Sequence, residues 1–306
     1  MNSSSAPASS LPPEAGLQDL LEALHVRRSI RTYDGQPLRP AHQAFIERYL
    51  HDGAHMTGPF GRRVRIELLQ GLPKDMQVGT YGYTKYFDAV LVAIAKDDPI
   101  DLFEMAWVAH GLVLQLTHLR LGTVWMGAAF SQQSVRRNLS FEDGEQVAAI
   151  IPLGYPRDKK RLFDLIASKG LASAHRKPLD FSCFVGSFER PLGDEQTDLR
   201  DALDLARFAP SAMNKQSWRV VLNEDARQVH VCAKFSLRHK IGMGFRQYAV
   251  APEYIDVGTW ARSFDIATRA TAIEGTWSIA APDLALPQDE DLEYLCTWTR
   301  SAAGGA

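Results

Sequence analysis

Apolar residues recur at helical spacing in several stretches of the chain and fill short continuous runs elsewhere. Spacings of three and four positions are typical of amphipathic helices, whereas short continuous apolar runs are typical of strands buried on both faces. We therefore predict helices at 15–25, 40–50, 101–121, 196–208 and 256–272. The same pattern predicts strands at 64–69, 90–95, 147–153, 218–222, 229–233 and 294–298.

The stretch 101–121 has the strongest helical pattern, and its apolar residues lie nearly all round the helix. A helix without a polar face is expected to be central and buried. Asp101 and Glu104 stand near its start, where a carboxylate favours the positive end of the helix dipole. Gly122 is expected to end it.

The order of these elements restarts in the second part of the chain. Pro191 precedes a predicted helix as Pro37 does, and Gly275 follows the second long helix as Gly122 follows the first. We interpret this as a degenerate internal duplication. A single extended domain is the alternative, because a repeated order of helices and strands also arises by chance. The expected division is a disordered lead at 1–14, a first half at 15–185, a second half at 186–300 and a tail at 301–306.

Composition restricts the class of protein. With 45% hydrophobic and 23% charged residues and a net charge of −2, the chain resembles a globular protein without a nucleic-acid partner. No apolar run approaches the ~18 residues of a membrane helix, so we expect no membrane partner. Its three cysteines form no CxxC pair, and the Ser-, Ala- and Pro-rich start lacks a signal-peptide pattern. We therefore expect a cytoplasmic protein.

Two short strings contain the candidate chemistry. The first, 27–31, joins three arginines to a serine, and fixed cations with a hydroxyl donor suit a phosphate monoester. The second, 209–218, contains Asn214 and Gln216, whose amides can match the polar edge of a heterocycle. A solvated helix end and an ordinary turn are the alternative interpretations of these strings.

Two further strings accompany them: Gly122–Gly127, and Ile151–Pro156 followed by Arg176-Lys177-Pro178. Together the four strings resemble the signature segments of the FMN-dependent nitroreductase family. The resemblance implies an α+β, nitroreductase-like fold. We call residues 27–31 the Arg–Ser string and residues 209–218 the Ser–Asn string. In that family the two corresponding strings face each other across a dimer interface, around one flavin.

The order of the strings departs from the usual family pattern. The Ser–Asn string is missing from its usual slot, 53–63, and occurs instead at 209–218, while 181–184 stands where a second Arg–Ser string belongs. Each half therefore retains what the other has lost. The chain resembles a subgroup in which one polypeptide folds as an intramolecular pseudo-dimer. This implies one complete flavin site between the halves and one lost site.

By motif position, the resemblance implies that Arg27 and Ser29 bind the FMN phosphate, helped by Arg176 and Lys177. Arg31 is expected at the pyrimidine side of the ring, and Gly127 and Ala128 at its N5 edge. Ser217 replaces the family's usual proline, which is expected to loosen the turn. The predicted cofactor-binding residues are Arg27, Arg28, Ser29, Arg31, Trp125, Met126, Gly127, Ala128, Arg176, Lys177, Pro210, Ser211, Asn214 and Gln216.

The implied function is FMN-dependent NAD(P)H oxidoreductase activity of nitroreductase type. Ping-pong hydride transfer would pass through FMN, with NADH or NADPH as co-substrate and a quinone, nitroaromatic or similar small molecule as acceptor. No catalytic side chain and no metal site are expected, because the chemistry belongs to the flavin. A non-catalytic FMN carrier or sensor is the main alternative, and a scaffold without flavin is a third. We expect a monomer, with further dimerisation left open.

Overall fold

The computed structural model describes residues 11–74, 76–157, 175–193, 197–235, 249–280, 282 and 291–302. Most of the predicted lead and tail lies outside these ranges. The described helices are α1 (Leu17–Val26), α2 (Pro40–His51), α3 (Pro99–His118), α4 (Gln132–Arg136), α6 (Arg200–Ala206) and α8 (Pro252–Ala270).

The strands form two sheets. The first sheet has the order β1-β2-β4-β3 and contains β1 (Arg65–Gln70), β2 (Ala89–Lys96), β4 (Glu145–Gly154) and β3 (Gly122–Thr123). The second has the order β5-β6-β7-β9-β8 and contains β5 (Cys183–Val185), β6 (Trp218–Leu222), β7 (Gln228–Lys234), β9 (Leu292–Arg300) and β8 (Gly275–Ser278).

The two sheets share one strand order once β5 is set aside. In chain order, β1, β2, β3 and β4 correspond to β6, β7, β8 and β9, and each set is antiparallel. β5 adds to the outer edge of the second sheet by pairing in parallel with β6. The second sheet therefore begins at Cys183, just before the seam expected near residue 185. The α+β prediction is confirmed, and both sheets are mainly antiparallel.

Both long helices begin earlier than their apolar patterns predict. α3 begins at Pro99, because the Asp98 side chain accepts hydrogen bonds from the backbone N–H groups of Ile100 and Asp101, each at 3.0 Å. α8 begins at Pro252, in the first-turn position that proline favours. The predicted helix at 196–208 is shorter, because α6 spans only Arg200–Ala206 in the described part of that region.

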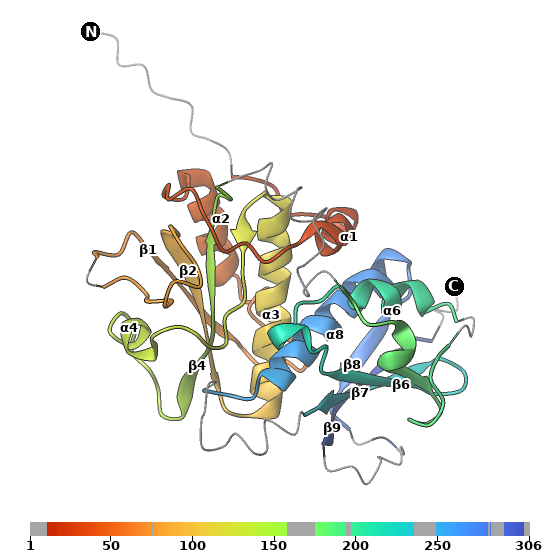
Figure 1. Ribbon diagram of the computed structural model, residues 1–306. Helices are drawn as coiled ribbons and strands as arrows, with labels where there is room; N and C mark the ends of the chain where they lie inside the picture. The colour runs from red at the N-terminus through yellow and green to blue at the C-terminus, as the bar shows by residue number, and fades with distance from the viewer. Residues whose placement is uncertain are drawn as a thin grey trace.

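The two long helices lie side by side between the two sheets (Figure 1). Their contact is close, since a Cβ built on Gly258 would stand 2.4 Å from the carbonyl oxygen of Phe103. Nearby, His110 Nε2 of α3 lies 3.1 Å from Ser263 Oγ of α8. One hydrophobic core cluster contains residues of both helices and both sheets. The halves therefore pack as one body around the helix pair.

No helix in the described part of the chain is long and apolar enough to cross a membrane. All three cysteines, Cys183, Cys232 and Cys296, are buried free thiols.

Candidate functional site at the seam between the halves

A cavity of about 640 Å³ opens beside the helix pair and is lined by both halves. Its volume lies in the range of small-molecule and cofactor sites. Every residue of the predicted site lines it except Lys177 and Gln216. Strings far apart in the chain are thus brought to one cavity: the first lies between α1 and α2 in the sequence, and the second between α6 and β6.

Arg27 follows α1 directly and is only 6% exposed. Within the described residues, its guanidinium has no ion pair and no hydrogen-bond acceptor. Burial lowers its pKa to about 9, and the positive charges of Arg176 and Arg28 act in the same direction. The group therefore stays charged at neutral pH in a site that disfavours charge. A bound anion would remove that penalty.

The Arg176 side chain anchors the second string. Its Nη1 donates to Asn214 Oδ1 at 2.6 Å and its Nη2 donates to the Phe208 carbonyl at 3.0 Å. Burial and neighbouring arginines lower its pKa to about 10. Arg28 instead donates from Nη1 to the carbonyls of His25 and Arg27, at the C-terminal end of α1. Arg176 therefore orients the amide that the sequence assigns to the cofactor.

Lys177 and Gln216 lie behind the turn rather than on the cavity wall. Gln216 is buried, and its Oε1 accepts a hydrogen bond from the Lys177 backbone N–H at 3.0 Å. Lys177 Nζ donates to the Lys215 carbonyl and lies 3.7 Å from the centre of the Phe181 ring. In this structure the two residues brace each other.

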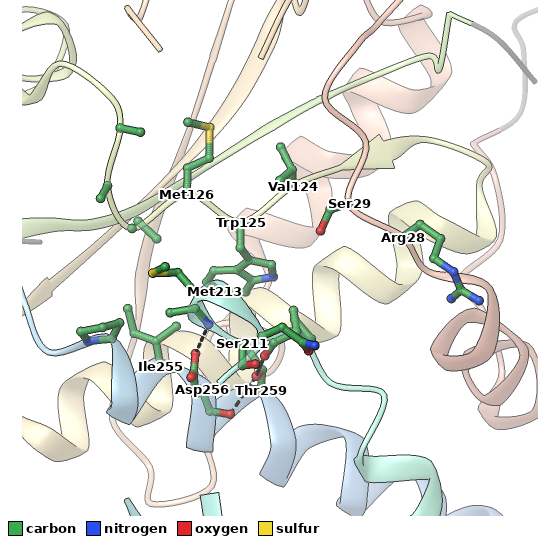
Figure 2. Close-up of a pocket in the computed structure, with 18 of the residues that line it drawn as sticks. Arg28, Ser29, Val124, Trp125, Met126, Ser211, Met213, Ile255, Asp256 and Thr259 are labelled. Carbon is green, nitrogen blue, oxygen red and sulfur yellow. Dashed lines mark hydrogen bonds between the residues drawn. The ribbon is translucent and has the colours of Figure 1, made fainter. Parts of the chain in front are cut away.

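The opposite wall comes from the segment after β3. Ser29 pairs with Thr123 as an isolated bridge, and the Ile30 N–H donates to the Thr123 carbonyl at 2.9 Å. This contact holds the Arg–Ser string against the 124–129 segment. Figure 2 shows the indole of Trp125 reaching across the cavity towards Ser211 and Met213 of the other half.

The turn at 209–218 has an unusual backbone. Met213, Asn214 and Gln216 have φ angles of 51°, 57° and 55°, in the left-handed region. Such conformations cost roughly 1 kcal/mol or more each in residues other than glycine, and they persist where other contacts fix them. The turn is therefore held by its surroundings.

Ser217 is one of those fixing contacts. Its Oγ donates to Asp256 Oδ2 at 2.9 Å, so the expectation that a serine at this position loosens the turn is wrong. The hydroxyl supplies an anchor to α8 that a proline could not supply.

Asp256 is the residue of the cavity wall that sequence reasoning missed. It lies near the start of α8, is 3% exposed, and accepts a second hydrogen bond from the Ala212 N–H at 2.8 Å (Figure 2). Burial raises its pKa to about 8, although both hydrogen bonds act in the opposite direction. The only available signal was a carboxylate inside a stretch that predicts a buried helix.

The difference in stability between Asp256→Asn and wild type is expected to shift in favour of the variant between pH 5 and pH 8. The folded-state pKa near 8 lies above the unfolded value of about 3.9. Between these values the folded protein keeps a proton that the unfolded chain has released, so wild-type stability falls as pH rises. The slope is at most about 1.4 kcal/mol per pH unit. Urea unfolding of both proteins at the two pH values measures it, and a constant difference would contradict the raised pKa.

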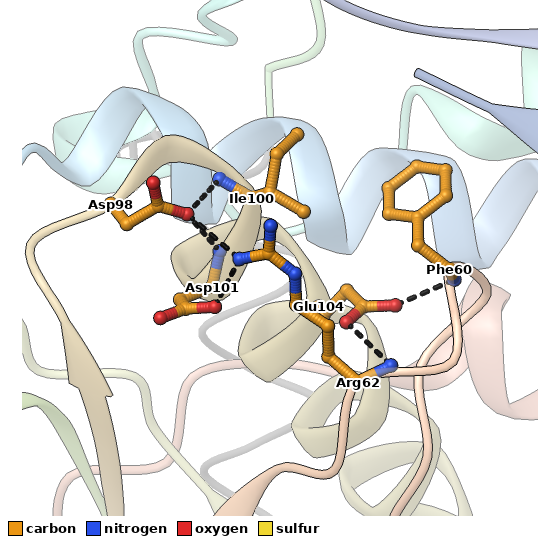
Figure 3. Close-up of polar contacts among 6 residues, drawn as sticks. All are labelled: Phe60, Arg62, Asp98, Ile100, Asp101 and Glu104. Carbon is orange, nitrogen blue, oxygen red and sulfur yellow. Dashed lines mark hydrogen bonds and ion pairs between the residues drawn. The ribbon is translucent and has the colours of Figure 1, made fainter.

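In the first half, residues 53–63 are the equivalent of the 209–218 turn, and a buried carboxylate fixes them in a similar way. Glu104 of α3 is fully buried and accepts hydrogen bonds from the backbone N–H groups of Phe60 and Arg62, at 2.6 and 3.1 Å. Arg62 also pairs with Asp98 and Asp101 at the start of α3 (Figure 3). The 53–63 segment is therefore hydrogen-bonded to α3, as the 209–218 turn is to α8.

Aromatic side chains fill this equivalent region. Counted from the opening proline of each long helix, Phe103 of α3 stands at the position of Asp256 in α8. The Phe103 ring lies 5.3 Å from that of Phe60 and 6.2 Å from that of Trp277, and Trp107 lies 5.4 Å from Trp277. Packed aromatic rings therefore occupy the region around the start of α3.

Known proteins resemble this chain in sequence and fold. The model of the family described as "Putative TM nitroreductase" matches residues 19–252. A protein of known structure from Thermotoga maritima MSB8, described as a "putative nitroreductase", is 15% identical with a TM-score of 0.58, and the match covers 96% of this chain and 98% of that one. A search of curated proteins finds no match.

Shorter nitroreductases match about half of the chain. A nitroreductase family protein from Clostridium novyi NT is 20% identical with a TM-score of 0.36, over 45% of this chain and 86% of its own. An FMN-dependent nitroreductase from Clostridium difficile R20291 is 19% identical with a TM-score of 0.36, over 45% and 88%.

The T. maritima match extends over both sheets and both long helices. It confirms a nitroreductase-like fold made of two similar halves in one polypeptide. The family model covers most of the chain, including both walls of the cavity up to Pro252. The chain therefore belongs to the nitroreductase family described as "Putative TM nitroreductase".

Proposed function

We propose that the protein is an FMN-dependent NAD(P)H oxidoreductase of nitroreductase type, with one FMN in the cavity between its halves. The observation that carries the proposal is the buried, uncompensated guanidinium of Arg27 in that cavity. Its acceptor would be a small molecule such as a quinone or a nitroaromatic compound.

The residues present fit FMN at both ends of the cavity. At one end, Arg27, Arg28 and Arg176 form a cationic cluster suited to a phosphate dianion. The remaining wall includes apolar side chains, among them Val124, Met126 and Ile255, which suit the faces of a planar ring. Charge at one end and apolar surface at the other match the two parts of this cofactor.

Each wall would have a separate role. Arg27, Ser29 and Arg176 would hold the phosphate, and Arg31 would lie towards the pyrimidine side of the ring. The backbone at Gly127 and Ala128 would approach the ring edge from the first half, while the 209–218 turn would close the site from the second. When bound, FMN supplies the hydride transfer between a nicotinamide and the acceptor. The protein's part is to bind, orient and polarise.

The purified protein is expected to contain one FMN per chain. One cationic cluster borders the cavity, whereas packed aromatic rings fill the equivalent region of the other half. The visible spectrum of the protein, followed by counting the FMN released on denaturation, tests this number. Two FMN per chain would contradict the single site, and none after adding FMN would favour a scaffold without flavin.

A turnover assay separates the enzyme from the carrier or sensor. Oxidation of NADH or NADPH by the FMN-loaded protein, with a quinone or nitroaromatic acceptor, is expected to be multiple-turnover. Stoichiometric FMN without such turnover would instead favour the non-catalytic alternative.

A further inference from the structure

Each long helix has a buried carboxylate near its start, and each carboxylate fixes the loop that leads into the first strand of the repeated topology. Glu104 of α3 accepts two backbone N–H groups of the loop before β1. Asp256 of α8 accepts the Ala212 N–H and the Ser217 hydroxyl of the turn before β6. In both halves a buried helix carboxylate therefore fixes a loop by hydrogen bonds, but of these two loops only the one fixed by Asp256 borders the cavity.

The turn before β6 needs such a contact more than an ordinary turn does. Three of its residues have left-handed φ angles, at 51° to 57°. Pro210, Ser211 and Ala212 line the cavity directly, so a change in the turn changes the wall. Asp256 contacts the turn at both ends, before and after the strained residues.

Both carboxylate oxygens of Asp256 are engaged by the turn, at 2.8 and 2.9 Å. Asp256, which itself lines the cavity, is therefore bonded to the turn through both of its carboxylate oxygens. A second contact of α8 supports this arrangement, because Thr259 Oγ1 donates to the Pro210 carbonyl at 2.9 Å.

We propose that Asp256 is a positioning residue that holds the 209–218 turn in its cavity-forming conformation, and that Glu104, one position further along α3, holds the loop before β1 in a similar way. The link to FMN affinity rests on the proposed function, whereas the hold on the turn does not.

Amide hydrogen exchange of the flavin-free, full-length protein tests the hold on the turn. Asp256→Ala is expected to accelerate exchange across 209–218 by at least about tenfold, because the Ala212 N–H and the Ser217 hydroxyl lose a buried acceptor. The matched control Glu104→Ala is expected to accelerate exchange at 58–63 and to leave 209–218 unchanged. Unchanged exchange across 209–218 in Asp256→Ala would overturn the proposal.

FMN titration, monitored by quenching of flavin fluorescence, tests the consequence for the site. Asp256→Ala is expected to weaken FMN binding roughly 10- to 100-fold. The dissociation constant of Glu104→Ala should stay within about twofold of wild type, even if its Tm falls as much as that of Asp256→Ala. Equal losses of affinity in the two variants, in step with Tm, would mean a merely structural role and overturn the proposal.

A milder variant covers the case in which Asp256→Ala does not fold. Ser217→Ala removes one of the two contacts and leaves the carboxylate in place, so we expect faster exchange across 209–218 and FMN binding weakened several-fold. The absence of both effects would overturn the proposal. A wild-type protein that binds no FMN would overturn the proposed function, and the exchange experiment would still decide the role of Asp256.

Discussion

Arg27→Met is expected to weaken FMN binding by about 100-fold or more and, at the same time, to stabilise the flavin-free protein. The buried guanidinium can offer a phosphate dianion two charge-assisted hydrogen bonds, each of about 1.5 kcal/mol or more. Their loss corresponds to a factor of about 100 in the dissociation constant. Fluorescence titration with FMN measures the loss.

The gain in stability follows from the direction of the pKa shift. Burial and two neighbouring arginines lower the pKa of Arg27 from 12.5 to about 9. For a base this means that the charged form is destabilised in the folded state, fully so below pH 9, and that the penalty is relieved only as pH rises through about 9. Replacing a buried charge by a methionine of similar length should therefore stabilise the flavin-free protein at pH 7 by roughly 1–4 kcal/mol. Urea unfolding measures it.

Riboflavin is the matched ligand control, because it has the same ring and no phosphate. Its affinity should be nearly the same in wild type and Arg27→Met, and an equal loss for both flavins would place Arg27 at the ring. Arg120→Met is the matched protein control, since the Arg120 side chain is 77% exposed. It should change neither stability nor affinity beyond about 0.5 kcal/mol. A destabilised Arg27→Met protein would contradict the view that Arg27 lacks a partner.

The sequence was most informative where apolar periodicity determines local structure. The run at 218–222 matches β6 from its first to its last residue, and the runs at 90–95 and 147–153 lie inside β2 and β4. Buried strands require continuous apolar residues, so these patterns are direct evidence. The start of α8 was predicted at residue 256 instead of Pro252, although proline favours the first turn of a helix.

The candidate site was less accessible to the same reasoning. The strings were located through a family resemblance, and no periodicity places residues 27–31 beside residues 209–218. Asp256 was missed because its partners, Ala212 and Ser217, are 44 and 39 residues away in sequence. Ser217 was misjudged for the same reason, since its anchor to α8 depends on tertiary packing. Contacts of this kind follow from how helices and turns meet, which local patterns do not encode.

Gly258→Ala is expected to destabilise the protein by about 2 kcal/mol or more and to weaken FMN binding with it. In an open helix position this substitution would stabilise by up to about 1 kcal/mol. Here the new Cβ would stand 2.4 Å from the Phe103 carbonyl oxygen and 2.8 Å from Ala106 Cβ. Neither atom belongs to a flexible side chain, so α3 and α8 must separate, and overpacking of this kind typically costs 1–3 kcal/mol. Urea unfolding and FMN titration measure the two effects.

Two other glycines provide graded controls for this close approach. Gly53→Ala places its Cβ in open space and should change stability by no more than about 0.5 kcal/mol. Gly111→Ala meets the Arg262 side chain at 3.2 Å and should have an intermediate effect, because that side chain can move. Equal losses of stability in Gly258→Ala and Gly111→Ala would mean that α3 and α8 can move apart at little cost in free energy. The expected order, with FMN affinity falling only for Gly258→Ala, would follow from a cavity whose two walls are held in register by the helix crossing.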